Sequence, residues 1–262
     1  MKKYILLAVV FIAVSCARAP ITGRTQLLLV GKDEVLTQSD LQYDSVLTES
    51  KVLENADTVL VRKVGEKIAV AVETFLRSKS EYAHLADDFN WEFNLIDSEQ
   101  VNAWCMPGGK VAFYTGILPY TQDETGIAVV MGHEIAHAVA DHGRERMSQE
   151  LLKQYGGATL SEVLGENAVA GSELFLEAYG AGSNLVTLKY GRDHEKEADK
   201  LGVIFMALAG YDPYEAVDFW NRMAADKTSE PLEFFSTHPN SATRIGLIKE
   251  YIGSEEFREY SK

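Results

Sequence analysis

The stretch His133-Glu134-Ile135-Ala136-His137 constrains this chain of 262 residues more than any other. Two histidines four positions apart lie one turn above each other on an α-helix, about 6 Å along its axis, so both imidazole rings can reach one point. A pair of neutral imidazoles is half of a typical zinc site. Glu134 leans to the same side and can take a proton from a metal-activated water. The alternative is a chance match on an amphipathic helix, with histidines in the core or at the surface.

The residues around this motif favour a real site. Thr121-Gln122-Asp123-Glu124 has the pattern of a capping box, which predicts a helix that begins just before the motif. Apolar residues then recur at helical spacing, at Ile127, Val130, Met131, Ile135 and Val139. An unpaired histidine would be costly among these apolar side chains. We expect the helix to end at Gly143 or at Gly156-Gly157.

Composition sets outer limits on fold and partners. Hydrophobic residues make up 46% of the chain, which can fill the core of one large domain or two small ones. The formal net charge is −14. An acidic surface argues against nucleic acid as a partner, because it repels phosphates. The same charge also fits an ordinary, well-solvated surface.

The N-terminal residues predict a signal peptide rather than part of the fold. Two lysines precede an apolar run over residues 4–14, which is too short to span a bilayer. Small residues then lead to Cys16, as in a bacterial lipobox, where the cysteine is lipidated and becomes the mature N-terminus. We therefore expect a signal peptide over residues 1–15, a lipid on Cys16 and a tether over residues 16–30. The alternative is an ordinary secretory signal that is cleaved nearby.

Cysteine usage agrees with a lipid anchor. The chain has two cysteines, Cys16 and Cys105. If Cys16 carries a lipid, Cys105 has no cysteine partner within the chain. The competing arrangement is a disulfide between the two, which a tethered N-terminus makes harder to form. We expect Cys105 to be a small buried residue rather than a nucleophile.

The remaining segments predict one α+β domain over residues 31–262. Three short extended segments indicate a small β-sheet, at 91–96, 101–106 and 111–115. Helical patterns precede and follow them, at 33–50, after Asn55 or Asp57, and at 160–188, 190–208, 212–223 and 241–252. Helices, a small sheet and further helices in this order are typical of α+β architecture.

A catalytic zinc site needs a third protein ligand and an open position. Ala140 and Gly143 stand where a metzincin would need glycine and histidine, which excludes that class. Glu162 lies at the spacing of the third ligand in a thermolysin-like enzyme. That enzyme class also needs an aspartate four residues later, where this chain has Glu166.

Glu195 is the better third ligand. Asp199 follows four residues later, so both carboxylates face one way on a helix. Asp199 can then accept a hydrogen bond from the far nitrogen of a ligand histidine and fix its tautomer. We expect Lys196 and Glu197 to lie on a solvated acidic face. His194 is a rival ligand, but its neighbouring position points about 100° away.

Together these motifs resemble the CAAX-prenyl-protease and HtpX-like zinc metallopeptidases. The H-E-x-x-H motif and the segment 195–199, Glu-Lys-Glu-Ala-Asp, match the metal-binding motifs of that family. Residues 102–109 are similar to its N-A-x-x-x-P-G-G segment, which leads to an edge strand beside the active site. Thr237-His238-Pro239 and Arg244 resemble the T-H-P-x-x-x-x-R motif of its periplasmic members.

The resemblance implies a mostly helical, gluzincin-like domain that acts as a zinc-dependent endopeptidase. Glu134 would be the general base. One Zn2+ per chain would be bound by His133, His137 and Glu195. The segment Val111, Ala112 and Phe113 would hold the substrate backbone by β-augmentation, which suits unfolded or extended polypeptides and gives loose specificity.

The resemblance also implies a place in the cell. The chain is similar to the small lipoprotein branch, which predicts a protein of the bacterial cell envelope, anchored by lipid in the outer membrane and facing the periplasm. Its substrates would be unfolded or misassembled proteins. The alternative is a zinc-bound chaperone or scaffold in envelope assembly with an occluded site. Glu134 argues against that alternative, because a structural zinc site needs no general base.

Two opposite roles can be assigned to His238. As a fourth ligand it would fill the open zinc position and switch the enzyme off. As a neighbour of the metal it would donate a hydrogen bond to the oxyanion during turnover. We favour the fourth ligand, because an unrestrained protease of loose specificity would threaten its own compartment.

Overall fold

The computed structural model describes residues 16–153, 190–225 and 242–260, together with residues 175, 176, 179, 234 and 238. The signal peptide predicted over residues 1–15 lies outside this part of the chain. So do Glu162 and nearly all of the helical segment predicted at 160–188. Across the residues that the structure describes, no helix is both long and apolar enough to cross a bilayer.

Helices dominate the described chain and follow the predicted segments closely. The longer ones are α2 (Lys32–Glu49), α3 (Ala56–Ser78), α5 (Glu124–Val139), α8 (Arg192–Leu208), α9 (Glu215–Ala225) and α11 (Ala242–Ile252). Shorter helical turns lie at η1 (Ala83–Asp88), η2 (Thr115–Ile117), α4 (Leu118–Thr121) and α12 (Glu255–Arg258). The predicted mostly helical α+β fold is confirmed.

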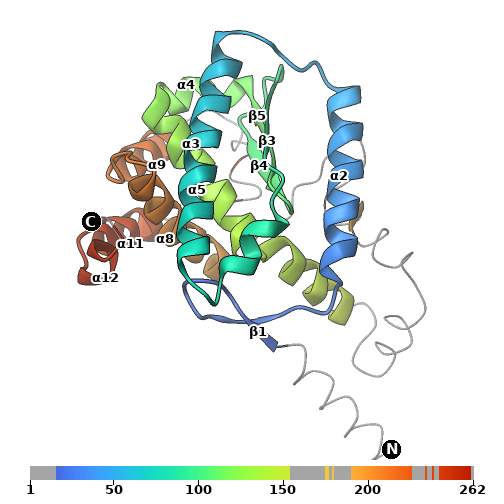
Figure 1. Ribbon diagram of the computed structural model, residues 1–262. Coiled ribbons are helices and arrows are strands. Elements are labelled where there is room, and N and C mark those ends of the chain that lie inside the picture. The colour runs from blue at the N-terminus through green and yellow to red at the C-terminus, as the bar shows by residue number, and fades with distance from the viewer. Residues whose placement is uncertain are drawn as a thin grey trace, which may run out of the picture.

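A three-stranded sheet lies between helices on both of its faces. Its strands are β3 (Glu92–Ile96), β4 (Ala103–Met106) and β5 (Lys110–Tyr114), in the order β3-β5-β4. Alternate residues of β5 therefore enter different cores. Val111 and Phe113 pack with α3 and α5, whereas Ala112 and Tyr114 pack with α2. Figure 1 shows α3 and α2 on either side of the sheet.

The strand order corrects one prediction. The segment Val111, Ala112 and Phe113 was expected to bind substrate by β-augmentation, but β5 is the central strand. It pairs in parallel with β3 and antiparallel with β4, so both of its hydrogen-bonding edges are already used. The edge strand nearest α5 is β4, which lies inside the N-A-x-x-x-P-G-G segment itself.

The N-terminal segment is attached to the domain rather than being a free tether. Residues 16–30 form a hairpin of β1 (Cys16–Arg18) and β2 (Thr25–Leu27). Ala19, Gln26 and Val30 are each at most 4% exposed. Arg24 forms ion pairs with two glutamates of the domain, which holds the hairpin in place.

Both ends of α5 differ from the predictions. Thr121 belongs to α4, and the true N-cap is Asp123, whose carboxylate accepts the N–H groups of Thr125 and Gly126. The helix ends at Val139, before Gly143. Asp141 takes a left-handed conformation with φ of 59°, and a new helix runs over residues 142–153. This break turns the next histidine back toward the H-E-x-x-H motif.

Candidate metal centre

Helices α5 and α8 cross in direct backbone contact at two glycines. A Cβ atom on Gly132 would lie 2.9 Å from the carbonyl oxygen of Gly202. A Cβ atom on Gly202 would lie 3.1 Å from the backbone nitrogen of His133. Only glycine permits so close an approach at both positions. The crossing brings the carboxylates of α8 within reach of the histidines of α5.

Four buried side chains converge at this crossing. They are His133, His137, Glu195 and His238, and the ligand atoms they offer all lie within 4.8 Å of one another. The two Nε2 atoms of His133 and His137 are 3.1 Å apart. The carboxylate oxygens of Glu195 lie 3.6 Å from His133 Nε2 and 3.5 Å from His137 Nε2. The three predicted ligands are thus together, and each is at most 2% exposed.

The arrangement of these ligand atoms fits the tetrahedral coordination of a cation such as zinc. Zinc binds nitrogen and oxygen at about 2.0–2.1 Å, which places tetrahedral ligands about 3.4 Å from one another. The separations around His133 Nε2 are 3.1, 3.3 and 3.6 Å to His137, His238 and Glu195. A single ring nitrogen carries at most one proton and cannot satisfy three neighbours. A cation at the centre would satisfy all of them.

The first ligand is backed by a buried charge pair. Nδ1 of His133 lies 3.2 Å from Oδ1 of Asp199, as predicted for a carboxylate that fixes the ring. Arg244 holds Asp199 with two hydrogen bonds of 2.6 and 2.7 Å and reaches Glu195 at 2.8 Å. Burial alone would raise the pKa of Asp199, but Arg244 and His133 hold that pKa below its usual value. Arg244 also lies 4.0 Å from the ring centroid of Trp220.

Glu134 lies beside the ligands with the environment of a general base. Its side chain is 2% exposed, and burial raises its pKa to about 7. A carboxyl group with such a pKa can accept and release a proton near neutral pH. The backbone N–H of Cys105, on the edge strand β4, faces this carboxylate and opposes the rise in its pKa. Cys105 itself is buried with a free thiol, as predicted.

His238 completes the cluster from a distant part of the chain. Its Nδ1 atom lies 3.0 Å from Oε1 of Glu195 and 3.3 Å from Nε2 of His133. Its other nitrogen, Nε2, lies 3.4 Å from Oε1 of Glu134. Phe234 stacks on the His238 ring and donates its backbone N–H to the carbonyl of Val101, just before β4. Thr237 and Pro239 lie outside the described residues.

Comparison with known proteins agrees with this geometry. Residues 66–252, which include the whole cluster, match the model of Peptidase family M48. The chain belongs to peptidase family M48. This confirms the resemblance to the prenyl-protease-like metallopeptidases.

Several metalloendopeptidases and a bacterial protease are similar to this chain. The mitochondrial metalloendopeptidase OMA1 of Saccharomyces cerevisiae is 28% identical over 247 residues, 90% of this chain and 68% of that protein. The human metalloendopeptidase OMA1 is 29% identical over 264 residues, 94% of this chain and 48% of that protein. The beta-barrel assembly-enhancing protease of Escherichia coli is 27% identical over 160 residues, 59% of this chain and 33% of that protein. The chain therefore spans about half or less of the human and bacterial relatives.

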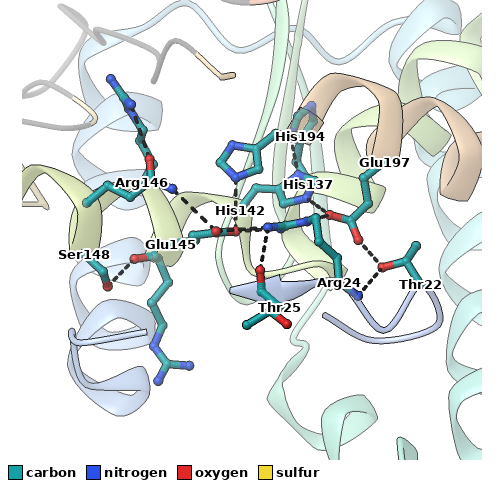
Figure 2. A network of polar contacts seen from close by, with 12 residues as sticks. Thr22, Arg24, Thr25, His137, His142, Glu145, Arg146, Ser148, His194 and Glu197 are labelled. Atoms are coloured by element: carbon teal, nitrogen blue, oxygen red, sulfur yellow. Dashed lines mark hydrogen bonds and ion pairs between the residues drawn. The ribbon is translucent and has the colours of Figure 1, made fainter. Parts of the chain in front are cut away.

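A second polar cluster of the M48 domain lies behind His137, and the sequence analysis missed most of it. Figure 2 shows its members, His142, Glu145, His194, Glu197 and Arg24. Glu197 was expected on a solvated face, but it is 5% exposed and pairs with His142 and Arg24. His194, the rival ligand, points away from the metal cluster and pairs with Glu145 at 3.0 Å. The sequence feature that could have indicated this cluster is His142, a third histidine shortly after the H-E-x-x-H motif.

Hydrogen bonds keep the two glutamates of this second cluster charged. Burial alone would raise the pKa of Glu145, but His194 and Arg24 lower that pKa to about 2. Burial lowers the pKa of His142 to about 4, although its hydrogen bond to Glu197 opposes the shift. Near neutral pH, the cluster therefore contains a neutral His142, the carboxylates of Glu145 and Glu197, and the guanidinium of Arg24, beside His194.

Proposed function

We propose that this M48 domain is a zinc-dependent endopeptidase. The observation that carries the proposal is the convergence of His133, His137 and Glu195 on one point, with Glu134 beside them. A zinc ion held by those three ligands would polarise the scissile carbonyl and lower the pKa of the attacking water. Glu134 would be the general base, which takes the proton of the attacking water and gives it to the leaving amine. Asp199 would orient His133, and Arg244, which pairs with both Asp199 and Glu195, would keep the Glu195 carboxylate charged.

Extended polypeptides are the substrates we infer, and β4 is the strand that would bind them. The backbone N–H of Cys105 on β4 faces the carboxylate of the base. A substrate strand added along β4 would therefore bring its carbonyl groups past Glu134. Recognition through backbone groups suits unfolded or misassembled proteins and gives loose sequence specificity.

We infer that His238 is a fourth ligand in the resting state, which the substrate must displace. Its Nδ1 atom faces the ligand cluster, and Phe234, which stacks on its ring, donates its backbone N–H to Val101, two residues before β4. The competing role, an oxyanion donor, uses the Nε2 atom near Glu134. Because His238 fills the cluster, a zinc-bound chaperone or scaffold with an occluded site is the second candidate function.

We propose that the protein acts in the bacterial cell envelope, where a lipid on Cys16 would anchor it in the outer membrane, facing the periplasm. The basic, apolar and small residues before Cys16 support this placement. The bacterial relative whose name refers to β-barrel assembly also supports it. Mass spectrometry of the mature N-terminus tests the anchor, and an unmodified peptide that spans Cys16 would contradict it.

The decisive assay compares wild type with Glu134→Gln on unfolded casein. The variant removes a base and no metal ligand, so it should keep its zinc and lose at least about a hundredfold in turnover. Equal turnover in both proteins would reject the endopeptidase mechanism. Absence of casein cleavage by wild type and His238→Ala, with zinc bound, would favour the occluded chaperone or scaffold.

A further inference from the structure

We propose that His142 is a positioning residue of the metal centre, which accepts the Nδ1 proton of His137 and so frees His137 Nε2 for the metal. This inference rests on the proposed function, because it assigns a role beside the same site. The Nδ1 atoms of the two rings lie 2.9 Å apart. His142 is fully buried, and its Nε2 atom lies 2.9 Å from Oε2 of Glu197.

The proton positions follow from these two contacts. The carboxylate of Glu197 only accepts hydrogen bonds, so Nε2 of His142 must carry a proton. An imidazole that binds a metal through Nε2 carries its single proton on Nδ1, so Nδ1 of His142, which faces that proton, must be the acceptor. Two bare nitrogens 2.9 Å apart would repel each other, so the proton between the rings belongs to Nδ1 of His137. That leaves Nε2 of His137 unprotonated, as a metal ligand requires.

The far end of this chain of bonds is fixed by the N-terminal hairpin. Arg24 donates from Nε to Glu197 at 2.5 Å and from its two terminal nitrogens to Glu145 at 3.0 and 2.6 Å. The hydroxyl of Thr22 also bonds to Glu197. Both oxygens of Glu197 thus accept a hydrogen bond from the hairpin, Oε2 from Arg24 and Oε1 from Thr22 (Figure 2). The carboxylate cannot turn from His142 without losing these bonds.

The two histidine ligands are therefore held in different ways. Nδ1 of His133 directly faces a carboxylate, with Oδ1 of Asp199 3.2 Å away. His137 reaches its carboxylate through a second imidazole, and Tyr190 stacks on its ring at 3.9 Å. The break at Asp141 turns the chain so that His142 can occupy this place. The helix break and the hairpin thus serve one task, the orientation of His137.

The test is zinc affinity, measured by competition with a chromophoric chelator. His142→Leu removes the acceptor and should weaken zinc binding by about 10–100-fold. His142→Asn can place its amide oxygen near the position of Nδ1, so we expect it to recover most of that loss. His194→Leu is the matched control, because His194 is buried in the same cluster and stacks on His142 but bonds to Glu145 instead of His137. The control should bind zinc as tightly as wild type.

A second measurement needs no metal. Nitrogen-15 NMR of the histidine rings in metal-free wild type should show His137 protonated at Nδ1, and this readout stands even if His142→Leu does not fold. A proton on Nε2 of His137 would overturn the proposal. Equal losses of affinity in His142→Leu and His194→Leu would also overturn it, since they would indicate a general structural effect. Failure of wild type to bind zinc would instead reject the proposed function, and the tautomer would still decide the role of His142.

Discussion

Gly132→Ala should separate the two helices that build the metal centre. The added Cβ atom would lie 2.9 Å from the carbonyl oxygen of Gly202, whereas ordinary van der Waals contact begins at 3.4 Å. The obstacle is backbone, which cannot rotate away, so the helices must move apart by roughly 0.5 Å. The ligand distances between α5 and α8, now 3.5 and 3.6 Å, would lengthen accordingly.

The magnitude follows from the tolerance of metal sites. Ligand positions are held to about 0.2 Å in a working site, so a shift of roughly 0.5 Å should cost at least tenfold in zinc affinity. Stability should change less. Alanine gains about 1 kcal/mol of helix propensity over glycine, and overpacking costs about 1–3 kcal/mol. The metal-free variant should therefore lose no more than about 2 kcal/mol in free energy of unfolding.

Gly246→Ala is the matched control for this experiment. Gly246 lies inside α11, and an added Cβ atom there meets nothing within 4 Å. This variant should gain about 1 kcal/mol and leave zinc affinity unchanged. Urea denaturation and chelator competition measure both quantities on both variants. Zinc binding by Gly132→Ala as tight as wild type would refute the claim that the glycine crossing sets the geometry of the site.

Three further predictions concern buried polar side chains. Arg244→Met leaves Asp199 and Glu195 buried without their cation, so the metal-free protein should lose about 3–5 kcal/mol in urea denaturation. His238→Ala should raise casein turnover if His238 is the resting ligand, and a loss of turnover with zinc bound would reject that role. The pKa of Glu145 is about 2 in the fold against 4.5 ordinarily, so its stabilisation is complete above pH 4.5 and disappears as pH falls toward 2. The stability difference between wild type and Glu145→Gln should shrink over that range, and a constant difference would contradict the assignment.

Local patterns predicted the elements well and singled out residues that the fold brings together. The spacing of two histidines on one helix depends only on helical geometry, as does the spacing of Glu195 and Asp199 on another. Asn55 caps α3 as expected, because a cap is a contact between near neighbours in the chain. Spacing alone left both Glu162 and Glu195 as possible third ligands. The match of residues 195–199 to a motif of the family favoured Glu195.

Features that depend on contacts between distant parts of the chain were not predicted. Glu197 has the sequence surroundings of a solvated helix face, and it is buried because the hairpin with Arg24 packs onto it from 173 residues away. The central place of β5 depends on strand order, which alternating hydrophobicity does not encode. The break at Asp141 needed a left-handed residue where no glycine marked it. That break placed His142 behind His137, a position that the periodicity of one continuous helix would not predict.

Zinc content is the most direct test of the central claim, that His133, His137 and Glu195 form the metal centre. Elemental analysis of purified wild type should find one zinc per chain. Glu195→Ala should lose that zinc, and Glu162→Ala, which changes the competing glutamate, should retain it. Full zinc in Glu195→Ala, together with its loss in Glu162→Ala, would contradict the account.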